Sequence, residues 1–321
     1  MRSYHGLCTN FCYRKGAIIE TRRFFSNQRP LEHLALSAPR HTTAALAEGT
    51  PVLDLHVAAE VLTGAAAKAG AAIMAHYGAT DEIEYKDDQS PVTQADRDSN
   101  EILETALREL APNIPIVSEE STTDRKASLG QTFFLVDPLD GTKEFIKERT
   151  DFTVNVGLID DGFPCFGLVY APARNLLAVT IADGVAIETS MAPSKDGADL
   201  NALSHKRLHA RAAHPEAITA LVSLSHLDRK TEEFLEGYSV TERTAAGSSI
   251  KFLEIARGNA DLYPRLGPTM EWDTAAGQAV LEAAGGHVVN TRGARFRYGK
   301  TDSALKNANF VAWGRSILTP R

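Results

Sequence analysis

Helix-like and strand-like segments alternate irregularly along this chain, and this irregular order is the strongest constraint on its fold. Apolar residues recur at helical spacing over 51–77 and over 93–110. Short runs rich in apolar, aromatic and β-branched residues then predict strands at 114–118, 133–136, 152–159, 165–170 and 176–181. Because helices and strands do not alternate one for one, the pattern predicts a layered, mixed α and β (α+β) fold and disfavours a regular βαβ barrel.

A polar, irregular stretch over 189–209 follows, and we interpret it as a boundary within the chain. It divides the chain into an N-terminal half, 49–190, and a C-terminal half, 191–321. Beyond it, the patterns predict helices over 229–236, from 248 onward and over 273–284, with strands near 220–225, 238–243, 260–263, 287–290 and 310–313. With 321 residues, of which 43% are apolar, the chain can bury a large core.

The first 48 residues differ from the remainder of the chain. They carry seven Arg and Lys residues against three Glu residues, and they show no sustained hydrophobic periodicity. An arginine-rich leader of this kind is compatible with a mitochondrial transit peptide. We favour a disordered tail, or an extension from an upstream start codon, and we leave residues 1–48 out of the fold prediction.

Bulk properties of the chain exclude several classes of function. The formal net charge of −7 argues against a nucleic acid polymer as partner. Three cysteines, Cys8, Cys12 and Cys165, are too few for a disulfide framework, which fits a reducing compartment such as the cytoplasm. The alanine-rich run over 64–75 is interrupted by Lys68, so we expect no transmembrane segment.

The hexapeptide Asp-Pro-Leu-Asp-Gly-Thr at 137–142 directly follows an apolar run. A strand before it would deliver Asp137 at its end, and the following proline would end the strand ladder there. Asp140 could then face the same point, beside the carbonyl of Leu139 and the hydroxyl of Thr142. Such hard oxygen ligands are the ones that magnesium prefers, although the same hexapeptide is also compatible with an ordinary turn.

Two further segments place acidic residues beside predicted elements. Ser-Glu-Glu-Ser at 118–121 follows a strand-like run and provides Glu119. Trp-Asp-Thr-Ala-Ala-Gly at 272–277 opens a helix-like run, and Asp273 could cap that helix. Each acid alone is compatible with an ordinary loop or capping role. Together with the hexapeptide at 137–142, they favour a metal site assembled from distant segments.

In this order and spacing, the three segments resemble the signature of the inositol monophosphatase superfamily of magnesium-dependent, lithium-sensitive phosphatases. The resemblance extends from about residue 53 to 313 and implies an α/β/α/β/α sandwich. Asp-Gly-Thr-Lys-Glu-Phe at 140–145 is similar to the bacterial 3'(2'),5'-bisphosphate nucleotidase branch, because the inositol branch usually has Thr-Asn-Phe after Gly-Thr. Further similar segments lie at 90–96, 225–226, 247–251 and 271–273.

The resemblance implies a set of metal ligands. Glu119, Asp137 and the carbonyl of Leu139 would hold one magnesium ion, and Asp137, Asp140 and Asp273 would hold a second. We therefore expect two or more Mg²⁺ ions per active site and inhibition by lithium. Carboxylates packed this closely would repel one another without cations, so the site predicts its own metal dependence.

The resemblance also implies how water and substrate are held. Thr142 and Asp96 would orient the attacking water, and Glu119 with Thr142 would take or steer its proton. Gly141 and Thr142 would offer backbone N–H groups to the phosphate, and the metal-ligand positions Glu119, Leu139, Asp140 and Asp273 would border it. The residues implied to bind the rest of the substrate are Ser248, Lys251 and Arg265, with His226 near a base.

The leading hypothesis for function is therefore magnesium-dependent hydrolysis of adenosine 3',5'-bisphosphate to AMP and phosphate, a reaction of sulfur metabolism. An inositol-1-monophosphatase or a related sugar-phosphate phosphatase is the nearest alternative, because the metal ligands would be the same. A catalytically inactive binding protein on the same fold is a third, although the expected ligand positions keep competent side chains.

We expect a small phosphorylated metabolite as the ligand, and a homodimer is compatible with the sequence. The expected location is the cytoplasm, with peripheral attachment to the inner membrane as an option that the resemblance implies. A mitochondrial location applies only if the leader is genuine.

Overall fold

The computed structural model describes residues 53–79, 84–85, 91–120, 129–224 and 228–321. These residues contain two large mixed sheets and six α-helices. The first sheet has the strand order β3-β4-β5-β6-β7-β8-β9. Its strands are β3 (Ile116–Ser118), β4 (Thr132–Asp140), β5 (Thr153–Asp160), β6 (Phe163–Ala171), β7 (Leu176–Ala182), β8 (Val185–Ser190) and β9 (His205–Arg207). Only the β3–β4 pair in this sheet is parallel.

The second sheet comes from the C-terminal part of the chain and has the order β11-β10-β12-β14-β13. Its strands are β10 (Ile218–Ser223), β11 (Val240–Ala246), β12 (Leu262–Arg265), β13 (His287–Asn290) and β14 (Phe310–Trp313). A short antiparallel pair, β1 (Glu84–Tyr85) and β2 (Pro91–Val92), stands apart from both sheets.

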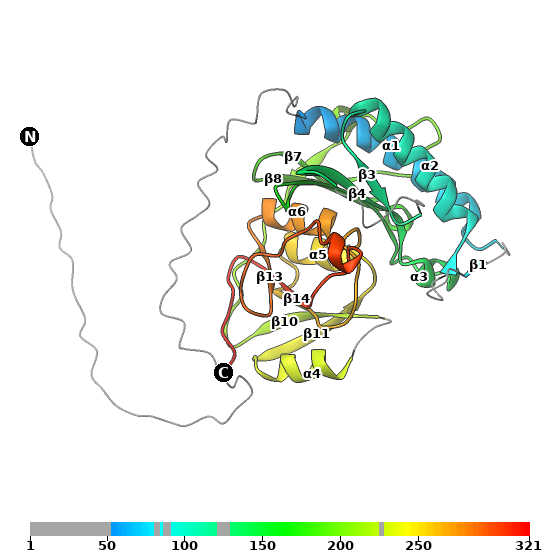
Figure 1. Cartoon of the computed structure of the whole chain (residues 1–321). Coiled ribbons are helices and arrows are strands. Elements are labelled where there is room, and N and C mark those ends of the chain that lie inside the picture. Colours follow the sequence, from blue (N-terminus) through cyan, green and yellow to red (C-terminus); the bar gives the residue numbers. More distant parts are fainter. Residues whose placement is uncertain (1–52, 80–83, 86–90, 121–128, 225–227) are drawn as a thin grey trace, which may run out of the picture. The chain divides into compact units, whose positions relative to one another are not determined.

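The helices and sheets form five layers (Figure 1). α1 (Leu55–His76) and α2 (Gln94–Leu110) pack on one face of the first sheet. α5 (Ile250–Ala256) and α6 (Ala275–Ala283) lie between the two sheets, and α4 (Arg229–Glu236) packs on the second sheet from outside. α3 (Thr142–Ile146) is one short turn after β4. The α/β/α/β/α sandwich expected from the resemblance is thus confirmed.

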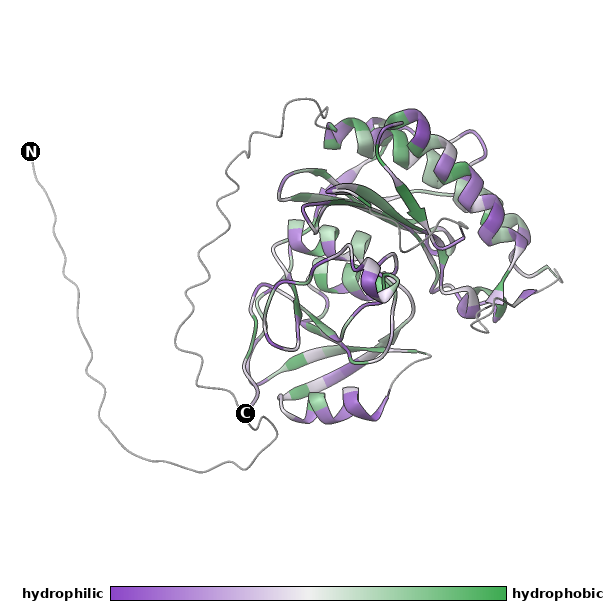
Figure 2. Ribbon diagram, viewed as in Figure 1, coloured by the Kyte–Doolittle hydropathy of each residue, from purple (hydrophilic) through white to green (hydrophobic). Residues whose placement is uncertain are grey.

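Strand β4 is apolar along its length because both of its faces are buried. Phe133 and Leu135 pack with the α5 and α6 side chains between the sheets, whereas Phe134 and Val136 face α1 and α2. This alternation follows from the two-residue repeat of a strand. Figure 2 shows the strands of the first sheet mostly in green, and purple hydrophilic residues along the outer helices.

Helix α6 lies unusually close to the first sheet, because small residues face each other there. A Cβ atom on Gly157 of β5 would lie 2.8 Å from the Ala275 side chain. A Cβ atom on Gly167 of β6 would lie 2.3 Å from the Ala276 carbonyl oxygen. The small residues Ala275 and Ala276 therefore pack against glycines of β5 and β6, and this contact holds the start of α6 against the first sheet.

Helix α1 corrects the expectation that no segment is long and apolar enough to cross a membrane. It has 22 residues with a mean hydropathy of 1.3 in its most apolar window, which satisfies that criterion by length and composition. Over half of this window, 56%, is buried within the fold. Side chains such as Leu62 and Ile73 are fully buried against the first sheet and α2, so α1 serves here as a core helix.

Three local expectations differ from the structure. Strand β4 does not end before Pro138; pairing with β5 resumes at Asp140 after a register shift, because a bulge accommodates the missing N–H. Asp273 is not the cap of its helix, since α6 begins at Ala275 with Thr274 as N-cap. The polar stretch 189–209 is not wholly irregular, because β8 extends into it and β9 pairs with β8.

Several expectations fall on residues outside the described part of the chain. These are the leader, 1–48, together with Ser90, Ser121 and His226. The division into halves at residue 190 stays a prediction. The first sheet extends past this position, because β9 joins it.

Candidate metal centre and active site

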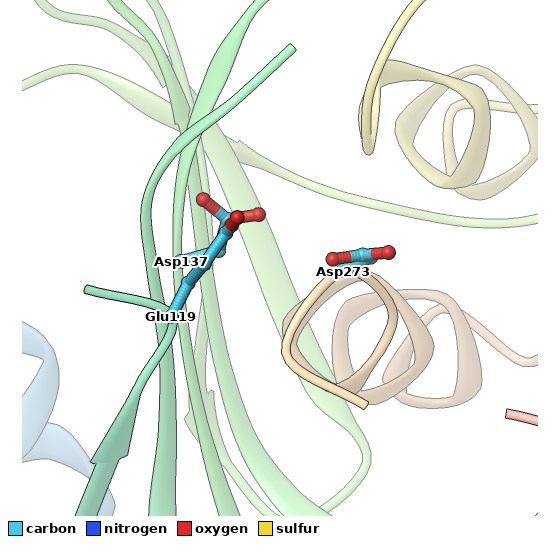
Figure 3. A group of neighbouring side chains, drawn as sticks. All are labelled: Glu119, Asp137 and Asp273. Atoms are coloured by element: carbon cyan, nitrogen blue, oxygen red, sulfur yellow. The ribbon is translucent and has the colours of Figure 1, made fainter. Parts of the chain in front are cut away.

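Three carboxylates from distant segments converge at one edge of the first sheet. Glu119, Asp137 and Asp273 each offer an oxygen, and these oxygens all lie within 4.8 Å of one another. Figure 3 shows Glu119 and Asp137 side by side on neighbouring strands, with Asp273 across from them at the start of α6. Within the described residues, this is the one group of three or more metal-ligating side chains that lies so close together.

The strand register explains why Glu119 and Asp137 are neighbours. β3 pairs parallel to β4 with Ser118 opposite Val136, so the next residue on each strand is acidic. The Glu119 N–H donates to the Val136 carbonyl at 3.0 Å, which continues the pairing by one residue. Parallel strands therefore bring the two side chains to the same edge.

Asp273 is held by its own turn before α6. One of its carboxylate oxygens accepts the Met270 N–H at 2.8 Å. Its backbone carbonyl accepts the Ser249 hydroxyl at 3.0 Å, which ties this turn to the start of α5. These contacts use one carboxylate oxygen and the backbone carbonyl, so the second carboxylate oxygen of Asp273 can serve as a ligand.

The bulge in β4 shapes the hexapeptide at 137–142. The Ser99 hydroxyl of α2 donates to the Pro138 carbonyl at 2.8 Å, and the Leu139 N–H donates to Asp137 at 3.1 Å. The Thr142 hydroxyl lies 3.2 Å from the Leu139 carbonyl oxygen. The segment is thus fixed by its own polar groups in a strand-to-helix bend.

Asp140 lies in the same cleft but outside the group of three. The Ser248 hydroxyl donates to its Oδ2 at 2.5 Å, and the Asn155 amide lies 3.5 Å from the same oxygen. Burial and the nearby Glu119 raise the pKa of Asp140, although the Ser248 hydrogen bond and Lys251 oppose this. Asp140 therefore lies at the site and is hydrogen-bonded to Ser248, which comes from the C-terminal part of the chain.

Electrostatic repulsion is concentrated on two of the carboxyl groups. Burial raises the pKa of Asp137 well above its ordinary value, and the charges of Glu119 and Asp140 raise it further. The pKa of Asp273 is likewise raised, first by burial and then by Asp140 and Glu119. Clustered, buried carboxylates resist ionisation, and a divalent cation relieves that cost.

Thr142 and Asp96 form a second polar pair beside the carboxylates. The Thr142 hydroxyl lies 3.2 Å from Asp96 Oδ1. Asp96 Oδ2 accepts both the N–H and the hydroxyl of Thr93, at 2.8 and 2.7 Å, at the start of α2. Burial raises the pKa of Asp96, with the Thr93 hydrogen bonds acting against it. The predicted partnership of Thr142 and Asp96 is geometrically present.

A cleft of about 410 Å³ opens over this group. Its lining includes four of the carboxylates and all the described residues expected to bind substrate: Glu119, Asp137, Leu139, Asp140, Gly141, Thr142, Ser248, Lys251, Arg265 and Asp273. A larger groove of about 790 Å³ lies between α1, α2 and residues 196–199, but no such carboxylate group lies there among the described residues.

Two buried cations in the cleft come from the second half of the chain. Lys251 is 4% exposed, and its ammonium donates to the Ser248 and Ala246 carbonyls at 2.6 and 3.2 Å. Burial lowers its pKa to about 8. Arg265 is 8% exposed and donates from one Nη to the Pro268 carbonyl at 2.8 Å, while its Nε has no hydrogen-bond partner among the described residues. Neither is the solvated surface charge that a lone Lys or Arg usually is.

Sequence reasoning missed residues that support the site without bearing its chemistry. Asn155 and Thr153 on β5 lie beside Asp140 and Ser248, and both are fully buried. Their signal is a polar residue at alternate positions of an otherwise apolar strand. Glu271 is also fully buried, pairs with Lys300 and accepts two backbone N–H groups, so it anchors the turn that carries Asp273.

The layered α/β fold carries a group of carboxylates that could hold a metal ion, and comparison with known proteins places the chain in a phosphatase family. The Inositol monophosphatase family matches residues 54–316 of this chain. The chain therefore belongs to the inositol monophosphatase family.

Relatives within the family carry a more specific name. A 3'(2'),5'-bisphosphate nucleotidase CysQ from Shigella flexneri is 42% identical over 243 residues, which cover 75% of this chain and 93% of the relative. The CysQ of Escherichia coli K12 is 41% identical with the same coverage. The crystal structure of CysQ from Bacteroides thetaiotaomicron is similar with a TM-score of 0.72 and 35% identity, covering 83% of this chain and all of that one.

Proposed function

We propose that this chain is a magnesium-dependent 3'(2'),5'-bisphosphate nucleotidase that hydrolyses adenosine 3',5'-bisphosphate to AMP and phosphate. The observation that carries the proposal is the convergence of Glu119, Asp137 and Asp273 within 4.8 Å in a cleft that also holds two buried cations. Relatives named for this activity are about 40% identical over most of the chain.

The donor set fits magnesium. Three carboxylates lie beside a backbone carbonyl and a hydroxyl, and all of these are oxygen ligands. Glu119, Asp137 and the Leu139 carbonyl would hold one ion, and Asp137, Asp140 and Asp273 a second. When bound, such cations would neutralise the carboxylates and stabilise negative charge on the phosphoryl oxygens.

The protein groups around the cations would orient water and substrate. The reaction consumes one water molecule, whose oxygen bonds to phosphorus while the ester oxygen leaves and takes up a proton. Thr142 is placed to accept a hydrogen bond from that water while donating its own proton to Asp96, 3.2 Å away. This relay would fix the direction of attack, as a positioned base does.

The buried cations favour a substrate with a second phosphate. Lys251 and Arg265 line the cleft beside the carboxylates, and phosphate is the ligand class that a fixed guanidinium and an ammonium recognise best. A polyol monophosphate carries no second anion to pair with them. The continuation Lys-Glu-Phe at 143–145 favours the nucleotide in the same direction.

A side-by-side substrate panel tests the proposal. Phosphate release is measured from adenosine 3',5'-bisphosphate, inositol 1-phosphate and a hexose phosphate, with Mg²⁺ and with added lithium. We expect kcat/KM for the bisphosphate to exceed that for the others by about tenfold or more, because one charged hydrogen bond is worth at least that ratio. We also expect lithium to inhibit. A preference for inositol 1-phosphate would assign the alternative function, and no turnover of any ester would favour a binding protein.

The remaining proposals concern setting and assembly. A small phosphorylated metabolite is the partner that this cleft accommodates, and the acidic net charge of −7 disfavours a nucleic acid polymer. We propose a cytoplasmic location. Whether a homodimer forms is a matter for light scattering of the purified chain.

A further inference from the structure

Asp151 occupies a junction between the two halves of the site, although it does not line the cleft. It lies two residues before β5 and is 6% exposed. One carboxylate oxygen accepts the Gly247 N–H at 2.8 Å, and the other accepts a hydrogen bond from Arg174. The side chain thus joins three segments that lie far apart in the sequence.

Asp151 also lies in close contact with two glycines, Gly141 and Gly247. A Cβ atom on Gly141 would lie 2.9 Å from the Asp151 carbonyl oxygen. A Cβ atom on Gly247 would lie 2.7 Å from both the Asp151 Cβ and its carbonyl oxygen. Gly141 follows Asp140 and precedes Thr142, whereas Gly247 precedes Ser248. Asp151 therefore lies between the loop that contains Gly141 and the loop that contains Gly247, and its contacts limit how closely these loops approach each other.

The Gly247 loop carries the groups that depend on this spacing. Ser248 has a φ of +49°, an unusual conformation for a residue with a side chain, so its backbone needs support from outside. Its hydroxyl contacts Asp140 and Thr153, and its carbonyl accepts the Lys251 ammonium at 2.6 Å. A displaced Gly247 would therefore move the Ser248 hydroxyl and release the anchor of Lys251.

We propose that Asp151, oriented by Arg174, is a positioning residue that holds the Gly247–Ser248 loop against Asp140 and so places Ser248 and Lys251 for the substrate. Among the described residues, Arg174 acts on the loop through Asp151, because its guanidinium donates to that carboxylate. The identity of the substrate in this inference rests on the proposed function.

Steady-state kinetics of Asp151→Ala, Arg174→Ala and the double variant test the inference. We expect Asp151→Ala to raise KM for adenosine 3',5'-bisphosphate by about tenfold or more, since a charge-assisted hydrogen bond that orders the loop is lost. We expect kcat to change less than threefold, because the Glu119–Asp137 edge and the Thr142–Asp96 pair do not depend on this contact. Arg174→Ala should raise KM less, and should add nothing in the Asp151→Ala background.

Asp261→Ala is the matched control. Asp261 is also buried, pairs with Arg211 at 2.7 Å and accepts the Thr219 N–H at 2.9 Å, and it lies outside the cleft lining. We expect it to lower the thermal unfolding temperature without raising KM. If Asp151→Ala lowers the unfolding temperature but leaves KM within twofold of the wild type, its role is structural and the inference is overturned.

Substitute variants and a second substrate allow the test to decide the role of Asp151 in every case. If Asp151→Ala does not fold, Asp151→Asn and Arg174→Ala replace it, and an unchanged KM in both overturns the inference. A wild-type chain that hydrolyses only another phosphate ester would overturn the proposed function alone. The same KM comparison on that ester would then still decide the role of Asp151.

Discussion

The Thr142 hydroxyl oxygen lies 3.2 Å from a carboxylate oxygen of Asp96, although 46 positions separate the two residues. Asp96 is held on its other oxygen by Thr93, at the first turn of α2. The contact links the bend after β4 to α2, and it fixes the Thr142 hydroxyl beside the carboxylate group. A hydroxyl oriented in this way can direct a water molecule.

Removing either member of this pair should slow the chemical step. We expect Thr142→Val and Asp96→Asn each to lower kcat by about 10² to 10⁴, the range for a positioned proton acceptor, with KM changed by about threefold or less. Steady-state phosphate release measures both. Thr105→Val, an exposed threonine on α2, is the control and should be neutral. A Thr142→Val enzyme with kcat within twofold of the wild type would remove the pair from the mechanism.

The raised carboxyl pKa values predict how metal removal and pH combine. The pKa values of Asp137 and Asp273 in the folded state lie above the ordinary value of 3.8. At a pH between 3.8 and the folded-state pKa values, the folded state therefore binds more protons than the unfolded state. The free energy of unfolding of the metal-free protein therefore falls as pH rises through that window. Added Mg²⁺ should raise the unfolding temperature more at pH 8 than at pH 5.

Thermal unfolding with chelator and with Mg²⁺, at the two pH values, measures this difference. In Asp137→Asn, where one repelling charge is absent, the metal-free protein should unfold at a higher temperature at pH 8 and respond less to Mg²⁺. If Mg²⁺ raised the unfolding temperature at pH 5 as much as at pH 8, or more, repulsion between these carboxylates would not be what destabilises the metal-free protein.

Lys251 predicts a pH dependence of substrate binding. Burial lowers its pKa to about 8, so its ammonium is charged below that pH and neutral above it. KM for the bisphosphate should therefore rise as pH increases through about 8, because a neutral amine pairs poorly with phosphate. Lys251→Met should raise KM at pH 7 and flatten this rise. If the variant keeps the wild-type pH profile of KM, another group titrates.

The close packing of α6 on the first sheet predicts a cost for any larger side chain there. Gly167→Ala would place Cβ 2.3 Å from a carbonyl oxygen of α6. We expect a loss of about 1 to 3 kcal/mol in the free energy of unfolding, as for other overpacked cores. Because Asp273 lies in the turn directly before α6, the concentration of Mg²⁺ for half-maximal activity should also rise.

Denaturant unfolding and a Mg²⁺ titration of Gly167→Ala check both parts of this prediction. Gly64→Ala on α1 is the control, because Gly64 lies away from the cleft and its Cβ would lie 3.3 Å from the Ala198 carbonyl oxygen, a looser approach than at Gly167. Equal stability of Gly167→Ala and wild type would mean that α6 can withdraw from the sheet without cost.

Local sequence patterns predicted the elements with strong periodicity or clear ends. The helix over 229–236 and the strands over 287–290 and 310–313 have the bounds that the structure gives them. The five-residue α3 and the polar β9 were missed, because a single turn and a short exposed edge strand leave no hydrophobic period. The prediction that Pro138 ends β4 was wrong for a different reason, because a β-bulge can accommodate a residue that lacks an N–H group.

The convergence of the site was predictable only in part. Glu119, Asp137 and Asp273 each follow or precede a predicted element, so their candidacy could be read from local sequence. The contact of Ser248 with Asp140, and that of Asp151 with Gly247, join residues about one hundred positions apart. Such pairs depend on how the sheets and helices pack, which no local pattern contains.

The central claim is that Glu119, Asp137 and Asp273 bind the cations on which hydrolysis depends. Its most direct test is phosphate release from adenosine 3',5'-bisphosphate across a Mg²⁺ titration, for the wild type, Asp137→Asn and Asp140→Asn. We predict no turnover in excess chelator, saturable activation of the wild type, and folded variants whose activity stays lower by about 10³ or more at every Mg²⁺ concentration. Undiminished turnover in chelator, or near-wild-type activity of Asp137→Asn, would contradict the claim.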